Sequence, residues 1–299
     1  MLQLLLGGSG SGKTTLLYQR IRARAEKGEK SILLVPEQFT SSTEGRIYRE
    51  LGDALSGMVE SFSFTSLAEK ILSTEGGAAV QTLSDAGRAV LVRRALEELQ
   101  DNVHYYHRHR RSAAFCQMAA QTIDELKSAG LSGQQLAQLA GACGAESGKL
   151  SELALIFQGY ETLLARSGMD PSDRLELAGA RLEEALARHS LPEFLRDRAV
   201  FIDEFDTFNA PKKRLLGAML AALPSVTVAL CDDGAPLLPG DLSLFSGAKQ
   251  VAAQLRQLAR KNGAEVAVPQ LLRKDLRHRN APGLAAVAEL LETGSCTAD

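Results

Sequence analysis

The chain has 299 residues, of which 45% are hydrophobic and 23% charged, and its net charge at pH 7 is -2. This length suits about two domains, or one α/β core with a large insertion, and the composition excludes a generally disordered chain. Apolar runs stay well short of the roughly 18 residues that span a bilayer, and the N-terminus has no secretory signal, so we expect a cytoplasmic protein without membrane partners. The charge shows no basic excess of the kind typical of nucleic-acid-binding domains, so a DNA-binding role needs local evidence.

The cysteines show no metal-binding or disulfide pattern. None forms a C-x-x-C pair, and no histidine lies at ligand spacing from one. We therefore expect neither a zinc site nor a disulfide framework. The residues concerned are Cys116, Cys143, Cys231 and Cys296.

Short, nearly continuous apolar runs predict strands that are buried on both faces, as in a parallel sheet. These runs cover residues 2–6, 32–35, 199–202, 226–230 and 266–268. Helical periodicity follows three of them, over residues 14–26, 211–223 and 247–261. The alternation of strand and helix predicts a doubly wound α/β fold.

The middle of the chain differs from this pattern. Residues 82–195 contain no convincing strand, and helical patterns cover residues 85–100, 112–129, 150–167 and 172–189, with a Gly/Ser-rich loop at 141–148. We predict an all-helical insertion (81–195) in a core made of 1–80 and 196–270. A helix over 282–292 and a polar tail then follow, and we assign 271–299 to the start of a further unit of a longer protein.

A phosphate-binding motif follows the first predicted strand. The sequence from Gly7 to Thr14 matches G-x-x-x-x-G-K-[ST] and precedes an amphipathic helix, as a P-loop requires. Its glycines let backbone N–H groups approach phosphate oxygens, and the helix N-terminus favours negative charge. A Gly/Ser-rich turn is the alternative, which the flanking strand and helix disfavour. The residues expected to bind ATP are Gly7, Gly8, Ser9, Gly10, Ser11, Gly12, Lys13, Thr14 and Thr15.

An acidic pair follows the strand predicted at 199–202. Asp203 lies where open α/β sheets bind ligands, and we expect it to hold Mg²⁺ together with the Thr14 hydroxyl, while Lys13 neutralises the β- and γ-phosphates. Glu204 is expected to orient or deprotonate the attacking water. The catalytic candidates are thus Lys13, Asp203 and Glu204. The alternative is an acidic strand end that caps the next helix.

With these motifs in place, the chain resembles the first motor domain of superfamily 1 helicases of the UvrD/RecB type. More narrowly, it is similar to the N-terminal part of the AddB (RexB) family of helicase/deoxyribonuclease proteins. The sequences after the second strand (35–40) and at 61–68 resemble the family's DNA-contacting motifs, and 203–207 resembles its acidic motif. The resemblance implies a RecA-like P-loop NTPase sheet and DNA contacts at Phe39, Thr40, Phe62, Ser63 and Phe64. For Phe39 and Phe64, base stacking and burial in the core are alternatives.

Two positions depart from the motor pattern. Related helicases carry a γ-phosphate-sensing glutamine after the next strand, whereas residues 230–235 contain none. Arg279 is similar to the first arginine that the second motor domain supplies, although Asn280 departs from the family's following residue. The missing glutamine argues against coupling of ATP hydrolysis to movement.

The resemblance implies an ATP- and DNA-binding domain of an ATP-dependent helicase/nuclease that acts in double-strand-break repair and recombination with a second, AddA-like subunit. It also implies a cysteine-bound iron-sulfur cluster, which we expect in the C-terminal part of the longer protein. The alternative is a nucleotide-binding scaffold that clamps DNA or a partner subunit without turnover. A P-loop small-molecule kinase is a third interpretation, which the long helical insertion disfavours.

One further stretch is both basic and aromatic. Residues 104–111 contain three histidines, two tyrosines and three arginines, Arg108, Arg110 and Arg111. Contact with unpaired DNA is one interpretation, since arginines meet phosphates and rings stack on bases. A solvated loop between helices is the other.

Overall fold

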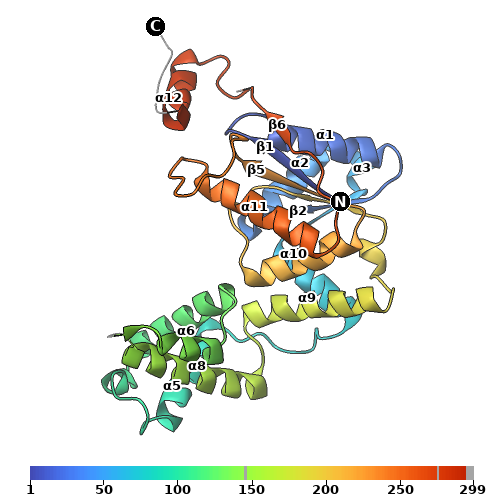
Figure 1. Cartoon of the computed structure of the whole chain (residues 1–299). Coiled ribbons are helices and arrows are strands. Elements are labelled where there is room, and N and C mark those ends of the chain that lie inside the picture. The colour runs from blue at the N-terminus through green and yellow to red at the C-terminus, as the bar shows by residue number, and fades with distance from the viewer. Residues whose placement is uncertain (145–146, 275, 294–299) are drawn as a thin grey trace. The chain divides into compact units, whose positions relative to one another are not determined.

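The computed structural model describes residues 1–144, 147–274 and 276–293. In them the chain forms an α/β fold with a six-stranded, wholly parallel sheet (Figure 1). The strands are β1 (Leu2–Gly7), β2 (Ser31–Leu34), β3 (Val59–Phe62), β4 (Ala199–Ile202), β5 (Ser225–Cys231) and β6 (Gln270–Leu272). The helices are α1 (Lys13–Ala25), α2 (Thr40–Leu51), α3 (Asp53–Ser56), α4 (Phe64–Glu75), α5 (Asp85–Glu98), α6 (Ala113–Ser128), α7 (Gly133–Ala140), α8 (Ser147–Ser167), α9 (Pro171–Ala187), α10 (Ala210–Ala222), α11 (Ser246–Lys261) and α12 (Pro282–Thr293).

The carboxyl ends of β1 and β4 lie close together on the same side of the parallel sheet. The order is β3-β2-β4-β5-β1-β6, so β5 lies between β1 and β4. In the register, Gly7 of β1 stands opposite Cys231 of β5, and Ile202 of β4 stands opposite Val228. Because all strands are parallel, the loops that follow β1, β4 and β5 leave the sheet together, at the position where open α/β sheets bind ligands.

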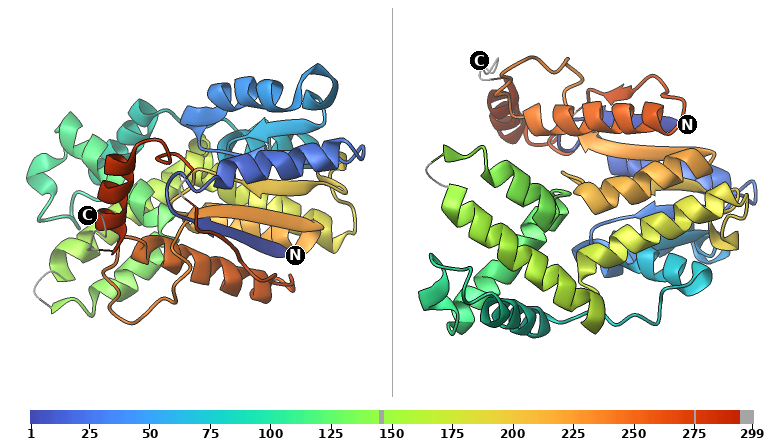
Figure 2. Two further views of the ribbon diagram at one scale, coloured as in Figure 1. Left: turned by 90° about the horizontal axis from the view of Figure 1, so that it is seen from above. Right: turned by 60° about the horizontal axis from the view of Figure 1, so that its bottom comes forward.

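Both faces of the sheet are buried, as the apolar strand sequences predict. Side chains alternate between the faces, and one face packs against α1 and α2 while α11 contacts β1 and β5. Figure 2 shows α1 and α11 on opposite faces of the sheet. The buried cluster below α1 and α2 contains Leu5, Leu17, Tyr18, Ile21, Leu33, Ile47, Phe201 and Ala229.

The described chain divides into two compact units. The sheet unit comprises residues 1–67, 182–208 and the described part of 216–299, and the helical unit comprises residues 68–181 and 209–215. The helical unit has its own core, and in its described residues the β-structure is limited to one isolated bridge, between Thr82 and Met169. Its core side chains include Leu91, Val92, Leu96, Ile123, Ile156, Phe157 and Tyr160. The domain ranges 1–80 with 196–270, 81–195 and 271–299 stay a prediction.

Most predicted strands and helices are confirmed to within a few residues, but the strand expected at 266–268 is wrong. Val266 makes an isolated bridge with Leu2, and regular pairing with β1 resumes only in β6, where Gln270 stands opposite Leu5. Four steps along the chain thus match three along β1, and Pro269, which has no N–H to donate, lies in the interruption. None of the described helices combines the length and the apolar character that crossing a bilayer needs.

Candidate functional site

The loop between β1 and α1 has a backbone that only glycine adopts readily. Gly10 and Gly12 have φ of 78° and 88°, in the left-handed region. A Cβ on Gly7 would lie 2.4 Å from Ser11 Oγ and 2.7 Å from the carbonyl oxygen of Leu272, so a larger residue does not fit there. Since α1 begins at Lys13, the amides of its first turn adjoin this loop and offer donors to an anion.

Lys13 lies across the same loop. Its Nζ donates hydrogen bonds to the carbonyl oxygens of Gly7 and Gly8, both at 2.8 Å. The loop also contains two serines. Ser9 Oγ accepts a hydrogen bond from Arg277 Nη1 at 3.1 Å, whereas the buried Ser11 Oγ has no hydrogen-bond partner in the described chain. The ammonium group is thus held at the loop by oxygen acceptors, and an anion bound there would meet a fixed positive charge.

The acidic pair stands at the end of β4. Asp203 is 7% exposed, its N–H donates to the carbonyl oxygen of Leu34 at 3.1 Å, and its Oδ1 accepts the N–H of Glu204 at 3.0 Å. Its carboxyl group also hydrogen-bonds the side chain of Thr14. Glu204 has φ of 64°, a left-handed conformation that is uncommon outside glycine and is characteristic of functional turns.

Burial shifts the titration of both acids. It raises the pKa of Asp203 above its usual range, although hydrogen bonds from Thr14 and the Glu204 amide and the charges of Lys13 and Arg46 act in the opposite direction. Burial and the neighbouring Asp203 charge likewise raise the pKa of Glu204. The pair therefore carries negative charge that is incompletely neutralised within the protein, as a site for a cation requires.

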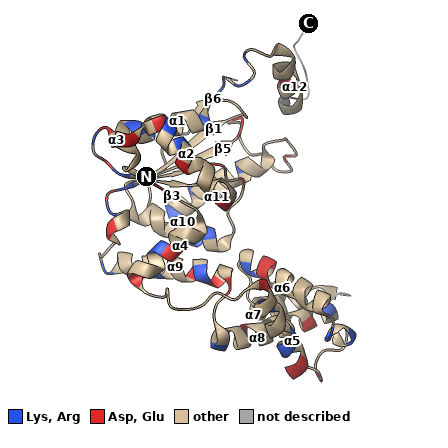
Figure 3. Ribbon diagram, turned by 180° about the vertical axis from the view of Figure 1, so that it is seen from behind, with Lys and Arg blue, Asp and Glu red and all other residues tan. Residues whose placement is uncertain are grey.

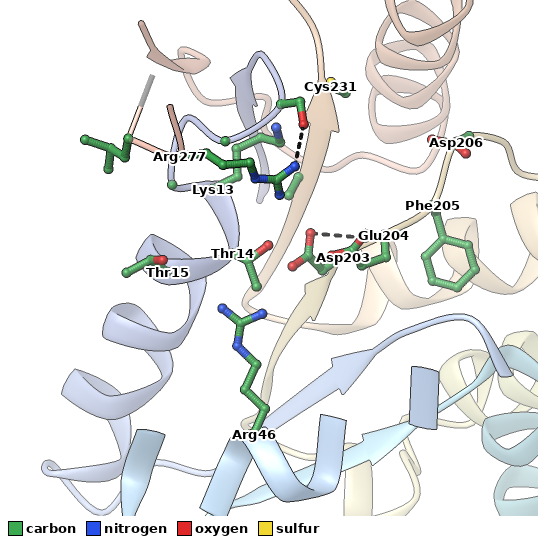
Figure 4. Close-up of a pocket in the computed structure, with 15 residues that line it drawn as sticks. Lys13, Thr14, Thr15, Arg46, Asp203, Glu204, Phe205, Asp206, Cys231 and Arg277 are labelled. Atoms are coloured by element: carbon green, nitrogen blue, oxygen red, sulfur yellow. Dashed lines mark hydrogen bonds between the residues drawn. The ribbon is translucent and has the colours of Figure 1, made fainter. Parts of the chain in front are cut away.

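A pocket of about 490 Å³ joins the loop and the acidic pair (Figure 4). Residues of β5 contribute to its wall between β1 and β4. The lining residues are Ser9, Gly10, Gly12, Lys13, Thr14, Thr15, Arg46, Asp203, Glu204, Phe205, Asp206, Ala229, Cys231, Leu276 and Arg277. The structure therefore brings Lys13, Thr14, Asp203 and Glu204 together, although they are about 190 residues apart in sequence.

Sequence reasoning missed Arg46. It lies on α2, its guanidinium stands 4.9 Å from the centre of the Tyr18 ring, and it points toward the acidic pair (Figure 4). Burial raises the pKa of Tyr18 to about 12, so this ring is a neutral platform for the cation. Only the fold brings α2 to the pocket, so no motif in the sequence marked Arg46.

The arginine that reaches the pocket after β6 is Arg277. Arg279, which the resemblance compares with an arginine of the second motor domain, is exposed and does not line the pocket. The backbone explains the difference, because the N–H of Leu276 donates to the carbonyl oxygen of Gly10 at 3.0 Å and so fixes the chain beside the loop immediately before Arg277.

Cys231 lines the pocket at the end of β5, in the segment where the resemblance leads one to expect a glutamine. The next residue, Asp232, turns inward. Its N–H donates to the carbonyl oxygen of Gly7 at 3.2 Å, and its carboxylate accepts the N–H of Gly234 at 2.6 Å. The β5 end is therefore used to hold the loop after β1.

The residues predicted to contact DNA follow the neighbouring strands β2 and β3. Phe39 is 38% exposed and Thr40 half-buried, at the start of α2. A hydrogen bond of 2.5 Å from Thr65 Oγ1 to Glu37 Oε1 joins the two segments. Because β2 and β3 are paired in parallel, both segments leave the sheet at the edge that carries the pocket.

The segment after β3 is more buried. The N–H groups of Ser63 and Ser66 each donate to the other's hydroxyl, which caps α4. Phe62 is half-buried near Phe194, whereas Phe64 is 1% exposed and packs edge-on against Phe205 and Phe208. The alternatives for both rings were base stacking and burial in the core. Phe64 is buried in the core, and Phe39 is partly exposed to solvent.

A magnesium ion at this site would depend on its nucleotide for most of its ligands. Among the described residues, no group of three or more His, Cys, Asp or Glu side chains could hold a metal by itself. Mg²⁺ that accompanies a nucleotide needs only one or two protein ligands, because phosphates and water supply the rest, so Thr14 and Asp203 suit it. Among the described residues, Cys116, Cys143 and Cys231 form no disulfide, and Cys296 lies outside the described residues.

Comparisons with known proteins place the chain in a family. Residues 4–288 match the family model described as "ADDB, N-terminal". The B subunits of ATP-dependent helicase/deoxyribonucleases are similar to this chain: that of Desulforudis audaxviator is 34% identical over 296 residues, that of Moorella thermoacetica 33% over 299 and that of Clostridium perfringens 29% over 283. The alignments cover 93–95% of this chain and 24–25% of those proteins, so the chain spans about a quarter of their length. The chain therefore belongs to the AddB N-terminal family.

Proposed function

We propose that this chain is the nucleotide- and DNA-binding domain, with a RecA-like P-loop NTPase fold, of an ATP-dependent helicase/nuclease protein. The parent protein would process double-strand breaks for DNA repair and recombination, together with an AddA-like second subunit. The observation that carries the proposal is the pocket in which Lys13, Thr14 and the Asp203–Glu204 pair converge at the carboxyl ends of parallel strands. The names of the related proteins support the role of the whole protein.

The chemistry of the pocket suits a nucleoside triphosphate. The loop amides and Lys13 would hold the phosphates, with Arg46 and Arg277 supplying further positive charge. Thr14 and Asp203 would hold Mg²⁺, which neutralises charge that develops on the transferred phosphoryl group. Glu204, whose pKa is raised, would accept a proton from water or orient it for attack.

DNA binding is proposed at the neighbouring strand ends. Phe39, with its exposed ring, is the candidate for stacking on a base, while Thr40, Phe62 and Ser63 shape the same edge. The buried Phe64 would act indirectly, because it packs against Phe205, which also lines the nucleotide pocket. Stacking on an aromatic side chain contributes about 1–3 kcal/mol per base.

A second candidate function is a scaffold that binds nucleotide and clamps DNA or its partner subunit without turnover. The observation in its favour is Cys231, since a thiol at the end of β5 is a much weaker hydrogen-bonding group for a γ-phosphate or water than an amide. The two candidates share a binding site and differ only in hydrolysis.

DNA-stimulated ATP hydrolysis by the full-length protein separates them. The assay compares the wild type with Lys13→Ala and with Lys27→Ala, an exposed lysine beyond the end of α1. Turnover that Lys13→Ala abolishes and Lys27→Ala preserves supports the motor. Nucleotide binding that depends on Lys13 without any turnover supports the scaffold.

Two other results would reject the proposal. A wild-type protein that binds no nucleotide would remove both candidates. Triphosphate binding without affinity for DNA would point instead to a P-loop kinase acting on a small molecule.

A further inference from the structure

We propose that the helical unit carries a second site for single-stranded nucleic acid, on the connection between α5 and α6. The site, called here the ring platform, is a hollow of about 420 Å³ in the described chain. Figure 1 shows α5, α6 and α8 packed together in this unit. The platform is lined by Tyr105, Tyr106, His109, Ala114, Phe115, Met118 and Lys149.

Three rings of the platform contact one another with tilted planes. The centroid of Phe115 lies 5.4 Å from that of Tyr106 and 5.6 Å from that of His109, with 30° between the planes in both pairs. Tyr105 and Met118 on the same hollow are 58% and 57% exposed. Flat rings with a polarisable thioether beside them are a surface on which an unpaired base stacks.

The backbone that presents these rings is fixed from below. Glu152, 6% exposed on α8, accepts hydrogen bonds from the successive N–H groups of His104, Tyr105 and Tyr106 at 2.7–3.3 Å. Gly148 provides room, because a Cβ there would lie 2.8 Å from the Tyr105 ring. The buried carboxylate thus fixes the backbone of this connection, and a preformed surface avoids much of the entropy cost of binding.

The charge beside the rings suits phosphates. Residues 104–111 contain three arginines and three histidines and no acidic residue. Elsewhere in the helical unit, basic and acidic residues are interspersed (Figure 3), and Arg93 and Arg94 pair with Glu97 and Glu98. Among the described residues, no carboxylate forms an ion pair with Arg108, Arg110 or Arg111, and Arg110 Nη1 contacts His107 Nδ1 at 3.3 Å.

Rings and cations together select the ligand. An acidic peptide would pair with the arginines but has no flat groups to stack on the aromatic rings. In a duplex, the faces of the bases are covered by their neighbours. A single strand offers both phosphates and exposed base faces. The ring platform does not involve the ATP pocket, and it adds a second contact with DNA to the one proposed at the ends of β2 and β3.

The test measures binding of a fluorescent oligothymidylate of about 10 nucleotides, within the typical 4–16-nucleotide range of such sites, to the full chain without ATP. Fluorescence anisotropy is recorded at several salt concentrations. Changing Arg108, Arg110 and Arg111 together to Ala lowers affinity and flattens the slope of log K against log salt by about 2, since each lost phosphate contact contributes about 0.7. The matched control changes Arg93 and Arg94 to Ala and leaves the slope unaltered.

Ring contacts are tested at the exposed Tyr105. Tyr105→Ala lowers affinity about tenfold with an unchanged salt slope, whereas Tyr105→Phe, which keeps the ring, binds as the wild type does. Thermal unfolding of each variant shows that the fold is kept.

Three outcomes would overturn the proposal: no binding of the oligonucleotide by the wild type, an unchanged salt slope in the triple variant, or an unchanged affinity in Tyr105→Ala. Competition by polyglutamate that Tyr105→Ala does not affect would also overturn it, in favour of a protein partner. Loss of ATP binding in Lys13→Ala concerns only the nucleotide pocket, so failure of that proposal is distinguishable from failure of this one.

Discussion

The sheet unit and the helical unit both bury charged side chains, but they provide for those charges differently. In the helical unit, Lys127 Nζ lies 2.6 Å from carboxylate oxygens of both Asp170 and Asp173. Burial alone would lower the pKa of Lys127, but its hydrogen bond to Asp170 and the nearby negative charges raise it instead. At the end of β4, by contrast, Asp203 has hydrogen bonds but no ion pair in the described chain, and burial raises its pKa.

We interpret this difference as one between a structural charge and a charge that is available to a ligand. A buried charge that has ion-pair partners is compensated within the fold, and removing one of the partners is strongly destabilising. A buried acid that is only partly compensated costs stability in the unliganded protein and is relieved when a cation binds. The contrast yields three predictions on stability and binding.

The largest effect is expected when Lys127 is changed to Ala. Asp170, whose side chain is 1% exposed, is then left as a buried charge without its cation, and the free energy of unfolding falls by about 3–5 kcal/mol. Urea denaturation followed by circular dichroism measures this change. The control Arg93→Ala removes an exposed pair in the same unit and costs below about 1 kcal/mol. Equal losses in both variants would contradict the distinction.

A smaller effect, on binding, is expected at Arg46. Arg46→Ala removes one cation from the pocket and weakens the binding of an ATP analogue about tenfold, which is about 1.4 kcal/mol. Isothermal titration calorimetry measures the affinity. Arg49→Ala on the same helix is the control, because the Arg49 side chain is exposed and contacts the carbonyl oxygen of Gly45. If both variants bind equally well, Arg46 does not belong to the site.

The smallest effect is a gain in stability. Asp203→Asn keeps an oxygen for the Glu204 amide and removes the buried charge, so we expect the unliganded protein to gain about 1 kcal/mol at neutral pH while losing Mg²⁺-dependent nucleotide binding.

The effect of Asp203 on the free energy of unfolding depends on pH in a predictable direction. Because the pKa of Asp203 is raised above its ordinary value of 3.8, the Asp203 contribution favours folding at lower pH and is lost as pH rises through the raised pKa. Unfolding midpoints measured at several pH values should therefore fall less steeply with rising pH in Asp203→Asn. A variant less stable than the wild type at neutral pH would argue that Asp203 is structural.

Local signals explain what the sequence revealed. The loop of Gly7 to Thr14 and the acids after β4 each occupy a few consecutive residues between a strand and a helix, so a motif and its flanks were enough to find them. Buried parallel strands such as β5 were found because both of their faces are apolar.

Features that depend on tertiary packing escaped prediction. β3 lies at the edge of the sheet, and its sequence Val-Glu-Ser-Phe is not a continuous apolar run. Its Glu60 is partly exposed and pairs with Arg198. Arg46 and Arg277 reach the pocket only because α2 and the segment after β6 pack beside the loop. The burial of Phe64 likewise depends on Phe205 and Phe208, which lie about 140 residues away in sequence.

The most direct test of nucleotide binding in this pocket is equilibrium binding of a fluorescent, non-hydrolysable ATP analogue with Mg²⁺ to the wild type, Lys13→Ala and Lys27→Ala. We predict saturable, Mg²⁺-dependent binding that weakens about 100-fold in Lys13→Ala, because charged hydrogen bonds worth about 3 kcal/mol are lost, and that Lys27→Ala leaves unchanged. Equal binding by all three proteins, or no binding by the wild type, would contradict the assignment of the pocket.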